Sequence, residues 1–242
     1  DVYKRQGVTL TVTVAIAFFG YSSLAASMAF GFLGAGLTGA LVYALGGVWQ
    51  GAGPVRLVLA GAAVNVALLA SARIILVNSD TDVFDRFRTW TVGSLEGRGT
   101  ELLLPTGAAV LAGFVIAYTI SGALDASVLG HDLSRSLGIK PAVVLSFATA
   151  AIIIMCGAVT AAAGPISFVG LTAPFIGRAL VGLRHRRLIP ATALIASAVV
   201  LVADIAGRLV VPSGEIGVGI MASVIGAPVF IAIVRRRRIP QL

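Results

Sequence analysis

The chain has 242 residues, of which 58% are hydrophobic and 12% are charged, and its mean hydropathy is +1.01. Soluble domains carry about 25% charged residues, so this composition excludes an ordinary soluble protein. The net charge of +8 comes from basic residues that cluster at the ends of apolar stretches. That distribution is typical of membrane topology signals and not of a nucleic-acid-binding face. We therefore expect a multi-pass membrane protein without a nucleic-acid partner.

The apolar stretches predict an all-α protein with about eight membrane spans. A span needs about 20 apolar residues, and the first stretch is shorter, so we interpret it as the tail of a span. Because the chain starts at Asp1 without Met, we expect further N-terminal spans to precede it. In chain order the predicted spans are Val8–Tyr21, Leu24–Val48, Leu57–Val77, Leu102–Ala123, Val143–Ala163, Ile166–Val181, Leu188–Val211 and Ile216–Val234.

The basic residues predict the orientation of these spans. If Arg235–Arg238 lie in the cytoplasm and the spans alternate, twelve of the 18 Lys and Arg residues fall on the cytoplasmic side. The opposite side then holds the acidic connection 78–101 and the short connection 212–215. This asymmetry is what the positive-inside rule predicts. The connection LDASVLGHDLSRSLGIKP, which starts at Leu124, is placed in the cytoplasm by the same count.

Glycine-rich stretches predict close helix packing, and one Gly–Pro segment predicts a broken helix. In lipid, small residues let helices approach closely, and GFLGAGLTGALVYALGG from residue 31 to 47 is interpreted in this way. In GPISFVGLTAPFIGRALVG, Gly164 and Pro165 are expected to end one helix and Pro174 to disrupt the next. Broken helices persist in membranes only where protein or a water-filled cavity covers them, and they often lie along transport pathways. Gly164, Pro165, Gly170 and Pro174 are therefore candidate pathway residues.

Few polar groups lie within the predicted spans. Asp204 and Arg208 are four residues apart, so they share a helix face, and both an internal ion pair and a docking contact of Arg208 with an acidic partner remain open. Asn65 is interpreted as a hydrogen-bonding group between helices. The single Cys156 and two histidines provide no metal-ligand set, and no catalytic constellation is present. We therefore expect neither an enzyme nor a cofactor.

The segment GPISFVGLTAPFIGRALVG, followed by RHRRLIPATAL, resembles the signature of the FecCD-type permeases. These are membrane subunits of ABC importers for iron-siderophores, haem and vitamin B12. The resemblance continues through LVADIAGRLV and PSGEIGVGIMASVIGAPVFIAIVRR, and LVLAGAAV, WTVGSLEGRG and LDASVLGHDLSRSLGI match upstream in the same order. Family members usually carry His after the Pro, where this chain has Phe175, so no role is assigned to that position. Such subunits usually have ten spans, of which about eight are present here.

The resemblance implies a single transmembrane permease domain over residues 1–242 of a bacterial inner-membrane importer. It implies a second permease subunit, identical or paralogous, two cytoplasmic ATPase subunits and an extracytoplasmic substrate-binding protein. It identifies residues 124–140 as the ATPase-coupling loop and places Arg208 near the outer face, where arginines receive glutamates of the binding protein. The expected coupling residues are Leu124, Leu129, Gly130, Ser134, Leu137 and Gly138.

An iron-siderophore complex is the expected cargo, with vitamin B12, haem or bare metal ions as alternatives. A secondary transporter driven by an ion gradient is a further alternative. It would need intramembrane carboxylates in both halves of the chain, and the one such group, Asp204, argues against it. A site for bare metal ions would need His, Cys or carboxylate ligands in the spans, which are scarce.

Overall fold

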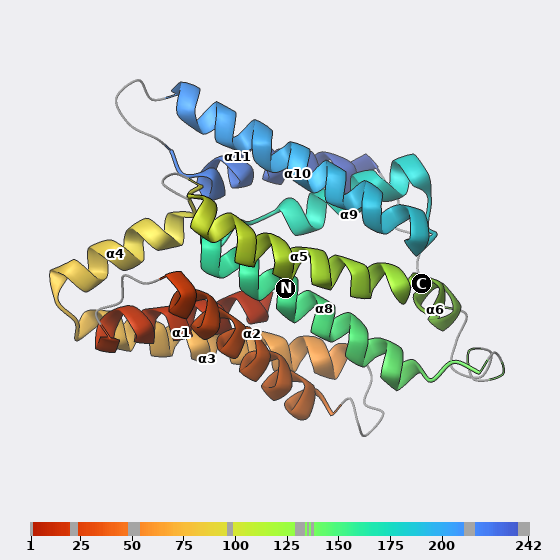
Figure 1. The fold of residues 1–242 in the computed structure, drawn as a ribbon, viewed down its shortest axis with the longest axis horizontal. Coiled ribbons are helices and arrows are strands. Elements are labelled where there is room, and N and C mark those ends of the chain that lie inside the picture. The colour runs from red at the N-terminus through yellow and green to blue at the C-terminus, as the bar shows by residue number, and fades with distance from the viewer. Residues whose placement is uncertain are drawn as a thin grey trace. The chain divides into compact units, whose positions relative to one another are not determined.

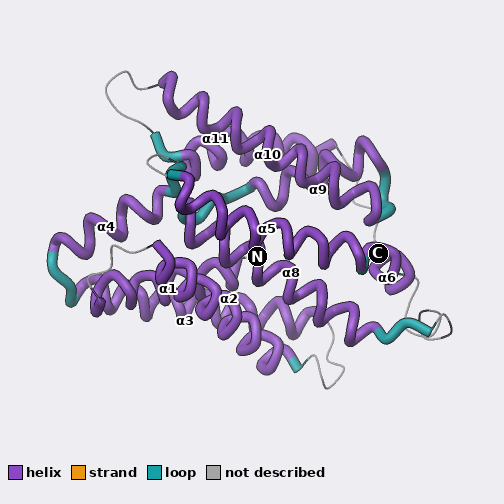
Figure 2. Tube along the Cα trace, in the orientation of Figure 1, coloured by secondary structure: helices purple, strands orange, loops and turns teal. Residues whose placement is uncertain are grey.

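The computed structural model describes residues 2–19, 24–47, 54–95, 99–128, 134, 136, 138–210 and 216–236. Every regular element in these ranges is an α-helix (Figures 1 and 2). The helices are α1 (Val2–Phe19), α2 (Leu24–Gly46), α3 (Pro54–Val77), α4 (Thr81–Val92), α5 (Thr100–Thr119), α6 (Ser121–Ser127), α8 (Pro141–Ala163), α9 (Val169–Val181), α10 (His185–Val210) and α11 (Val218–Arg236).

The apolar helices confirm the predicted multi-pass membrane fold. Within the described residues, five helices are long and apolar enough to cross a membrane, namely α2, α3, α5, α8 and α10. Apolar parts of α1, α9 and α11 are shorter. Only 11 to 39% of the residues in the five spanning windows are buried. A helix that is apolar but mostly uncovered by protein is stable only where lipid covers it.

Two connections differ from the sequence-based expectation. The polar connection 78–101 contains α4, whose helix begins directly after Asp80, and the backbone N–H of Val83 donates to the carbonyl of that residue. The predicted span Leu102–Ala123 is too long at its end, because α5 stops at Thr119 and the short α6 follows from Ser121. The backbone at Ile120 separates the two helices with φ −85° and ψ 0°, outside the helical range.

The described chain divides into two compact units, and the first contains the N-terminal helices. It comprises residues 1–91, 97–114 and 149–165, so α1, α2 and α3 pack together with parts of α4, α5 and α8. Between α1 and α2, Thr11 Oγ1 donates to the carbonyl of Phe30 at 2.7 Å. Buried side chains form two clusters, one of Val8, Val12 and Ala35, the other of Leu102, Ala158, Ala161 and Ala162.

The second unit comprises residues 92–96, 115–148 and 166–242 and contains α6, α9, α10 and α11. Its core consists of small side chains, with Ala203, Val218 and Ala222 buried together. Small residues allow close contact: a Cβ atom at Gly207 would lie only 2.5 Å from the carbonyl oxygen of Ile216. The sequence-based expectation of small-residue packing is thus met between α10 and the start of α11.

Candidate functional site

The candidate helix break lies at residues 164–168, between α8 and α9. Gly164 follows the last residue of α8 with φ +76°, and its N–H donates to the carbonyl of Thr160 at 2.9 Å. A left-handed glycine directly after a helix is a common C-terminal cap, and the following Pro165 cannot continue the helix. The sequence places this break correctly. Its role in a pathway remains a prediction.

Pro174 does not break the next helix, and this part of the prediction is wrong. It lies inside α9, which runs without interruption from Val169 to Val181. Pro174 has no N–H for the carbonyl of Gly170, so the helix loses one hydrogen bond. The packing of α9 against α10 and α11 in the same unit offsets this loss. In a membrane helix, such local losses are tolerated where neighbouring helices cover the segment.

Phe168 begins α9 in a strained conformation that the sequence does not reveal. Its φ of 65° is the one positive φ among the described non-glycine residues. The carbonyl of Phe168 accepts two bonds from Thr172, one from the backbone N–H at 2.9 Å and one from Oγ1 at 3.0 Å. Gly226 of α11 lies against it, since a Cβ atom there would be 2.7 Å from the Phe168 Cβ. Such strain costs about 1–3 kcal/mol and persists where packing enforces it.

The position at which this chain departs from the usual family pattern has a packing role. Phe175 of α9 contacts Phe230 of α11 edge to face, with ring centroids 5.7 Å apart and an interplanar angle of 72°. Edge-to-face pairs are favourable because the positive edge of one ring meets the negative face of the other. The aromatic residue therefore joins the same two helices that Phe168 and Gly226 join.

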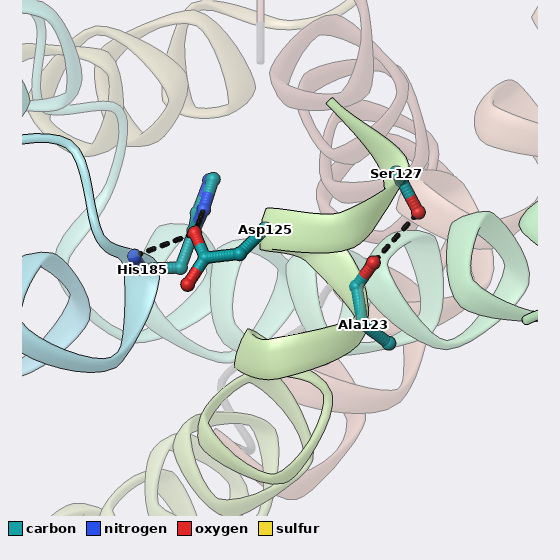
Figure 3. A network of polar contacts seen from close by, with 4 residues as sticks. All are labelled: Ala123, Asp125, Ser127 and His185. Carbon is teal, nitrogen blue, oxygen red and sulfur yellow. Dashed lines mark hydrogen bonds and ion pairs between the residues drawn. The ribbon is translucent and has the colours of Figure 1, made fainter. Parts of the chain in front are cut away.

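A polar link connects α6 to the start of α10 (Figure 3). The carboxylate oxygen Oδ1 of Asp125 accepts the backbone N–H of His185 at 3.0 Å, and the Nδ1 atom of His185 lies 2.6 Å from the same oxygen. In α6 itself, Ser127 donates to the carbonyl of Ala123 at 2.7 Å. Asp125 and His185 are 60 residues apart, so neither the sequence around Asp125 nor the sequence around His185 indicates the contact by itself.

The bond from the His185 N–H holds the pKa of Asp125 below its ordinary value of 3.8, and the side-chain bond to His185 lowers it further. A carboxylate with a lowered pKa stabilises the fold fully above its ordinary pKa, and this stabilisation is lost as the pH falls through the lowered value. The link between α6 and α10 is therefore intact throughout the neutral range.

The predicted coupling residues lie on both sides of a gap in the described chain. Leu124 is half-buried in α6, and Ser134 is fully buried. The carbonyl of Ser134 accepts the N–H of Ile139 at 3.1 Å, and Gly138 has φ +76°, a conformation that glycine adopts without strain. Leu129, Gly130 and Leu137 lie outside the described residues. Because α6 leads into the coupling segment, the link between Asp125 and His185 fixes the position of the start of that segment.

The polar residues within the spans are placed as follows. Asp204 Oδ2 accepts a bond from Arg208 Nε at 2.9 Å, so the predicted pair forms on α10. The Arg208 side chain is 47% exposed and that of Asp204 20% exposed. The side-chain oxygen of Asn65 on α3 is buried and has no hydrogen-bond partner within the described chain. At this oxygen the expected hydrogen bond between helices is therefore not present among the described residues.

No cluster of three His, Cys, Asp or Glu residues within the described ranges has the arrangement of a metal site. The features above are instead helix ends, a helix break and small-residue contacts between apolar helices. Together they define a polytopic helical membrane protein.

Comparison with known proteins identifies the family. Residues 5–236 match the model of the FecCD transport family, and the chain belongs to this family. The family is a transport family, so the prediction that the chain is not an enzyme is confirmed. The sequence-based resemblance is confirmed as well.

Relatives and a solved structure match most of the chain. The ferric enterobactin transport system permease protein FepD of Escherichia coli (strain K12) is 40% identical over 237 residues, which are 96% of this chain and 70% of FepD. The iron(3+)-hydroxamate import system permease protein FhuB of Bacillus subtilis (strain 168) is 35% identical over 96% of this chain and 60% of FhuB. An inward-facing metal-chelate type ABC transporter of known structure superposes with a TM-score of 0.85 and 28% identity, over 98% of this chain and 75% of that one. The chain thus spans 60 to 70% of the two relatives.

Proposed function

We propose that the chain is a permease subunit of a bacterial inner-membrane ABC importer for ferric siderophores. It forms the translocation pathway with a second permease subunit, which is a second copy or a paralogue. Two cytoplasmic ATPase subunits drive transport, and an extracytoplasmic binding protein delivers the cargo. The observation that carries this proposal is the family match across residues 5–236, in a chain whose apolar helices could cross a membrane.

Relatives that transport ferric enterobactin and ferric hydroxamate support the siderophore as cargo. These two chelates differ in chemistry, yet both relatives match 96% of this chain. The pathway is therefore expected to be generic and the binding protein to select the cargo. The intramembrane carboxylate Asp204 is already paired with Arg208, which argues against a relay of carboxylates in a secondary transporter.

Reconstitution tests this function. The permease, its ATPase subunits and its binding protein are placed in proteoliposomes, and ATP hydrolysis and uptake of a radiolabelled ferric siderophore are measured together. Uptake should require both ATP and the binding protein. Transport driven by an ion gradient without the ATPase subunits would contradict the proposal and favour a secondary transporter.

The coupling segment 124–140 provides a variant for the same assay. We expect Gly130→Asp to leave ATP hydrolysis in place and to reduce uptake about tenfold or more, because the new charge disturbs the surface that transmits the motion of the ATPase. Gly99→Asp is the matched control, since it introduces the same side chain on the opposite side of the membrane, where the space around Gly99 is open. Normal coupled uptake by Gly130→Asp would refute the assignment of the loop and leave the importer function standing.

Arg208 is proposed to receive a glutamate of the binding protein, and the 47% exposure of its side chain supports this role. Arg208→Glu should weaken docking about tenfold or more, because it places like charges opposite each other. The same change also opposes Asp204 within α10. The double variant Asp204→Lys with Arg208→Glu restores an internal pair of reversed sign but leaves the wrong charge at the outer face. If the affinity for the binding protein recovers in this double variant, Arg208 has only a structural role.

A further inference from the structure

A basic cavity opens in the second unit beside the Asp125–His185 link. Its volume is about 610 Å³, and it is formed by the last turn of α5, by α6, by the turn that leads into α10 and by the first turn of α10. The lining residues are Tyr118, Gly122, Asp125, Arg184, Arg186 and Arg187. The helix break lies outside this cavity, and Asp125 is the one lining residue that belongs to the coupling segment 124–140.

The charges around the cavity favour an anion. None of its three arginines has a salt-bridge partner among the described residues, and all three side chains are exposed. The one acidic group, Asp125, is already engaged by His185. Three guanidinium groups against one satisfied carboxylate leave an excess of positive charge. The planar fork of arginine donors matches the oxygen atoms of a phosphate group.

Exposed large apolar side chains lie within a few residues of the lining residues in sequence. Leu180 at the end of α9 is 71% exposed, Leu183 is 74% exposed, and Val128 after α6 is 77% exposed. A small soluble anion would leave these apolar side chains uncovered, whereas the acyl chain of a lipid would cover them. The cavity also lies where two apolar spans end, since Tyr118 belongs to the last turn of α5 and α10 starts at His185. Phosphate groups of lipids and interfacial tyrosines occupy this depth of a bilayer.

We propose that this cavity binds the phosphodiester headgroup of an anionic phospholipid, with its acyl chains along Leu180 and Leu183. The positive-inside count assigns the cavity to the cytoplasmic leaflet, where anionic lipids attract basic clusters. The site goes beyond the proposed transport function. It requires that these helices cross a membrane in the predicted orientation, and it depends on neither the cargo nor the ATPase.

Native mass spectrometry of the full chain in detergent tests the site by titration with phosphatidylglycerol and, separately, with phosphatidylcholine. The double variant Arg186→Gln with Arg187→Gln should bind phosphatidylglycerol about five-fold more weakly for each arginine removed, and phosphatidylcholine unchanged. Gly122→Leu fills the cavity without a change in charge, and no atom lies within 4 Å of a Cβ atom at Gly122, so the variant should fold and still lose the lipid. Arg56→Gln is the control, because Arg56 is exposed on the same predicted side but does not line the cavity.

Four results would overturn the proposal. If both cavity variants retain phosphatidylglycerol, or if Arg56→Gln loses it equally, the cavity has no specific role. If soluble glycerol phosphate binds as tightly as the lipid, the site takes a free anion. If the ATPase subunits displace the lipid from the assembled complex, the arginines serve an acidic segment of that partner instead. Because lipid binding is measured without transport, none of these results bears on the importer function.

Discussion

Gly34→Ala should destabilise the protein by about 1–3 kcal/mol, whereas Gly36→Ala, two residues further along α2, should not. A Cβ atom at Gly34 would clash with Thr11 Oγ1 and with the carbonyl oxygen of Gly7, and it would lie 2.8 Å from the Gly7 carbonyl carbon. The obstacle is largely backbone, so α1 and α2 must separate. At Gly36 nothing lies within 4 Å of the added atom. There the change gains about 0.5–1 kcal/mol from helix propensity.

The measurement is the temperature at which half of the detergent-solubilised protein remains monodisperse. One kcal/mol corresponds to about 2–4 °C for a domain of this size. Because Gly34→Ala is expected to destabilise the protein and Gly36→Ala to stabilise it, the two variants should shift this temperature in opposite directions. Gly7→Ala provides a second test from the facing helix, because its Cβ atom would meet Thr38 and the Gly34 carbonyl. Equal shifts for Gly34→Ala and Gly36→Ala would show that the α1–α2 contact contributes little to stability.

This pair of glycines also shows how far sequence reasoning reaches. The small residues between positions 31 and 47 predict close packing as a group, and the structure confirms close approach at Gly34. Composition cannot say which glycine faces a partner, because that depends on the rotation of α2 about its axis. Hydropathy gives no help either, since α2 is apolar on all sides.

The presence and order of the apolar helices were predictable because the physical signal is local, although the bounds of several differ from the predicted ones. A run of about 20 apolar residues is stable only as a helix across the bilayer, whatever lies elsewhere in the chain. The break at Gly164 and Pro165 was predictable for the same reason, since both residues act on their own backbone. At Pro174 this reasoning fails, because neighbouring helices in the second unit decide whether the lost hydrogen bond breaks α9.

The candidate site was less predictable because its contacts join residues that are distant in sequence. Asp125 and His185 are 60 residues apart. The sequence around Asp125 is already interpreted as a cytoplasmic connection and that around His185 as a basic topology signal, so neither interpretation requires a contact between them. Phe168 has no sequence signal at all. It has a positive φ and packs against Gly226 of α11, 58 positions later in the chain.

The contact between Phe168 and Gly226 gives the second large expected effect. Gly226→Ala should cost about 1–3 kcal/mol of stability, because the added Cβ would lie 2.7 Å from the Phe168 Cβ and 3.5 Å from its Cγ. Phe168→Gly removes both of these atoms, and glycine adopts φ 65° without strain. In the double variant the cost of Gly226→Ala should therefore largely vanish, with a coupling of about 1–2 kcal/mol in a double-mutant cycle. Thermal stability and ferric siderophore uptake are both measured.

Phe168→Ala is the control for this cycle, because alanine removes the ring but keeps the Cβ atom and the strained backbone. Combined with Gly226→Ala, it should leave the short Cβ–Cβ contact in place and rescue little. Rescue by glycine alone would show that the close approach of α11 to the start of α9 holds Phe168 in its strained conformation. Equal rescue by alanine and glycine would contradict that cause and assign the coupling to the aromatic ring. If uptake then follows stability in every variant, the helix break acts through packing, because a residue that met the cargo directly would lose uptake without losing stability.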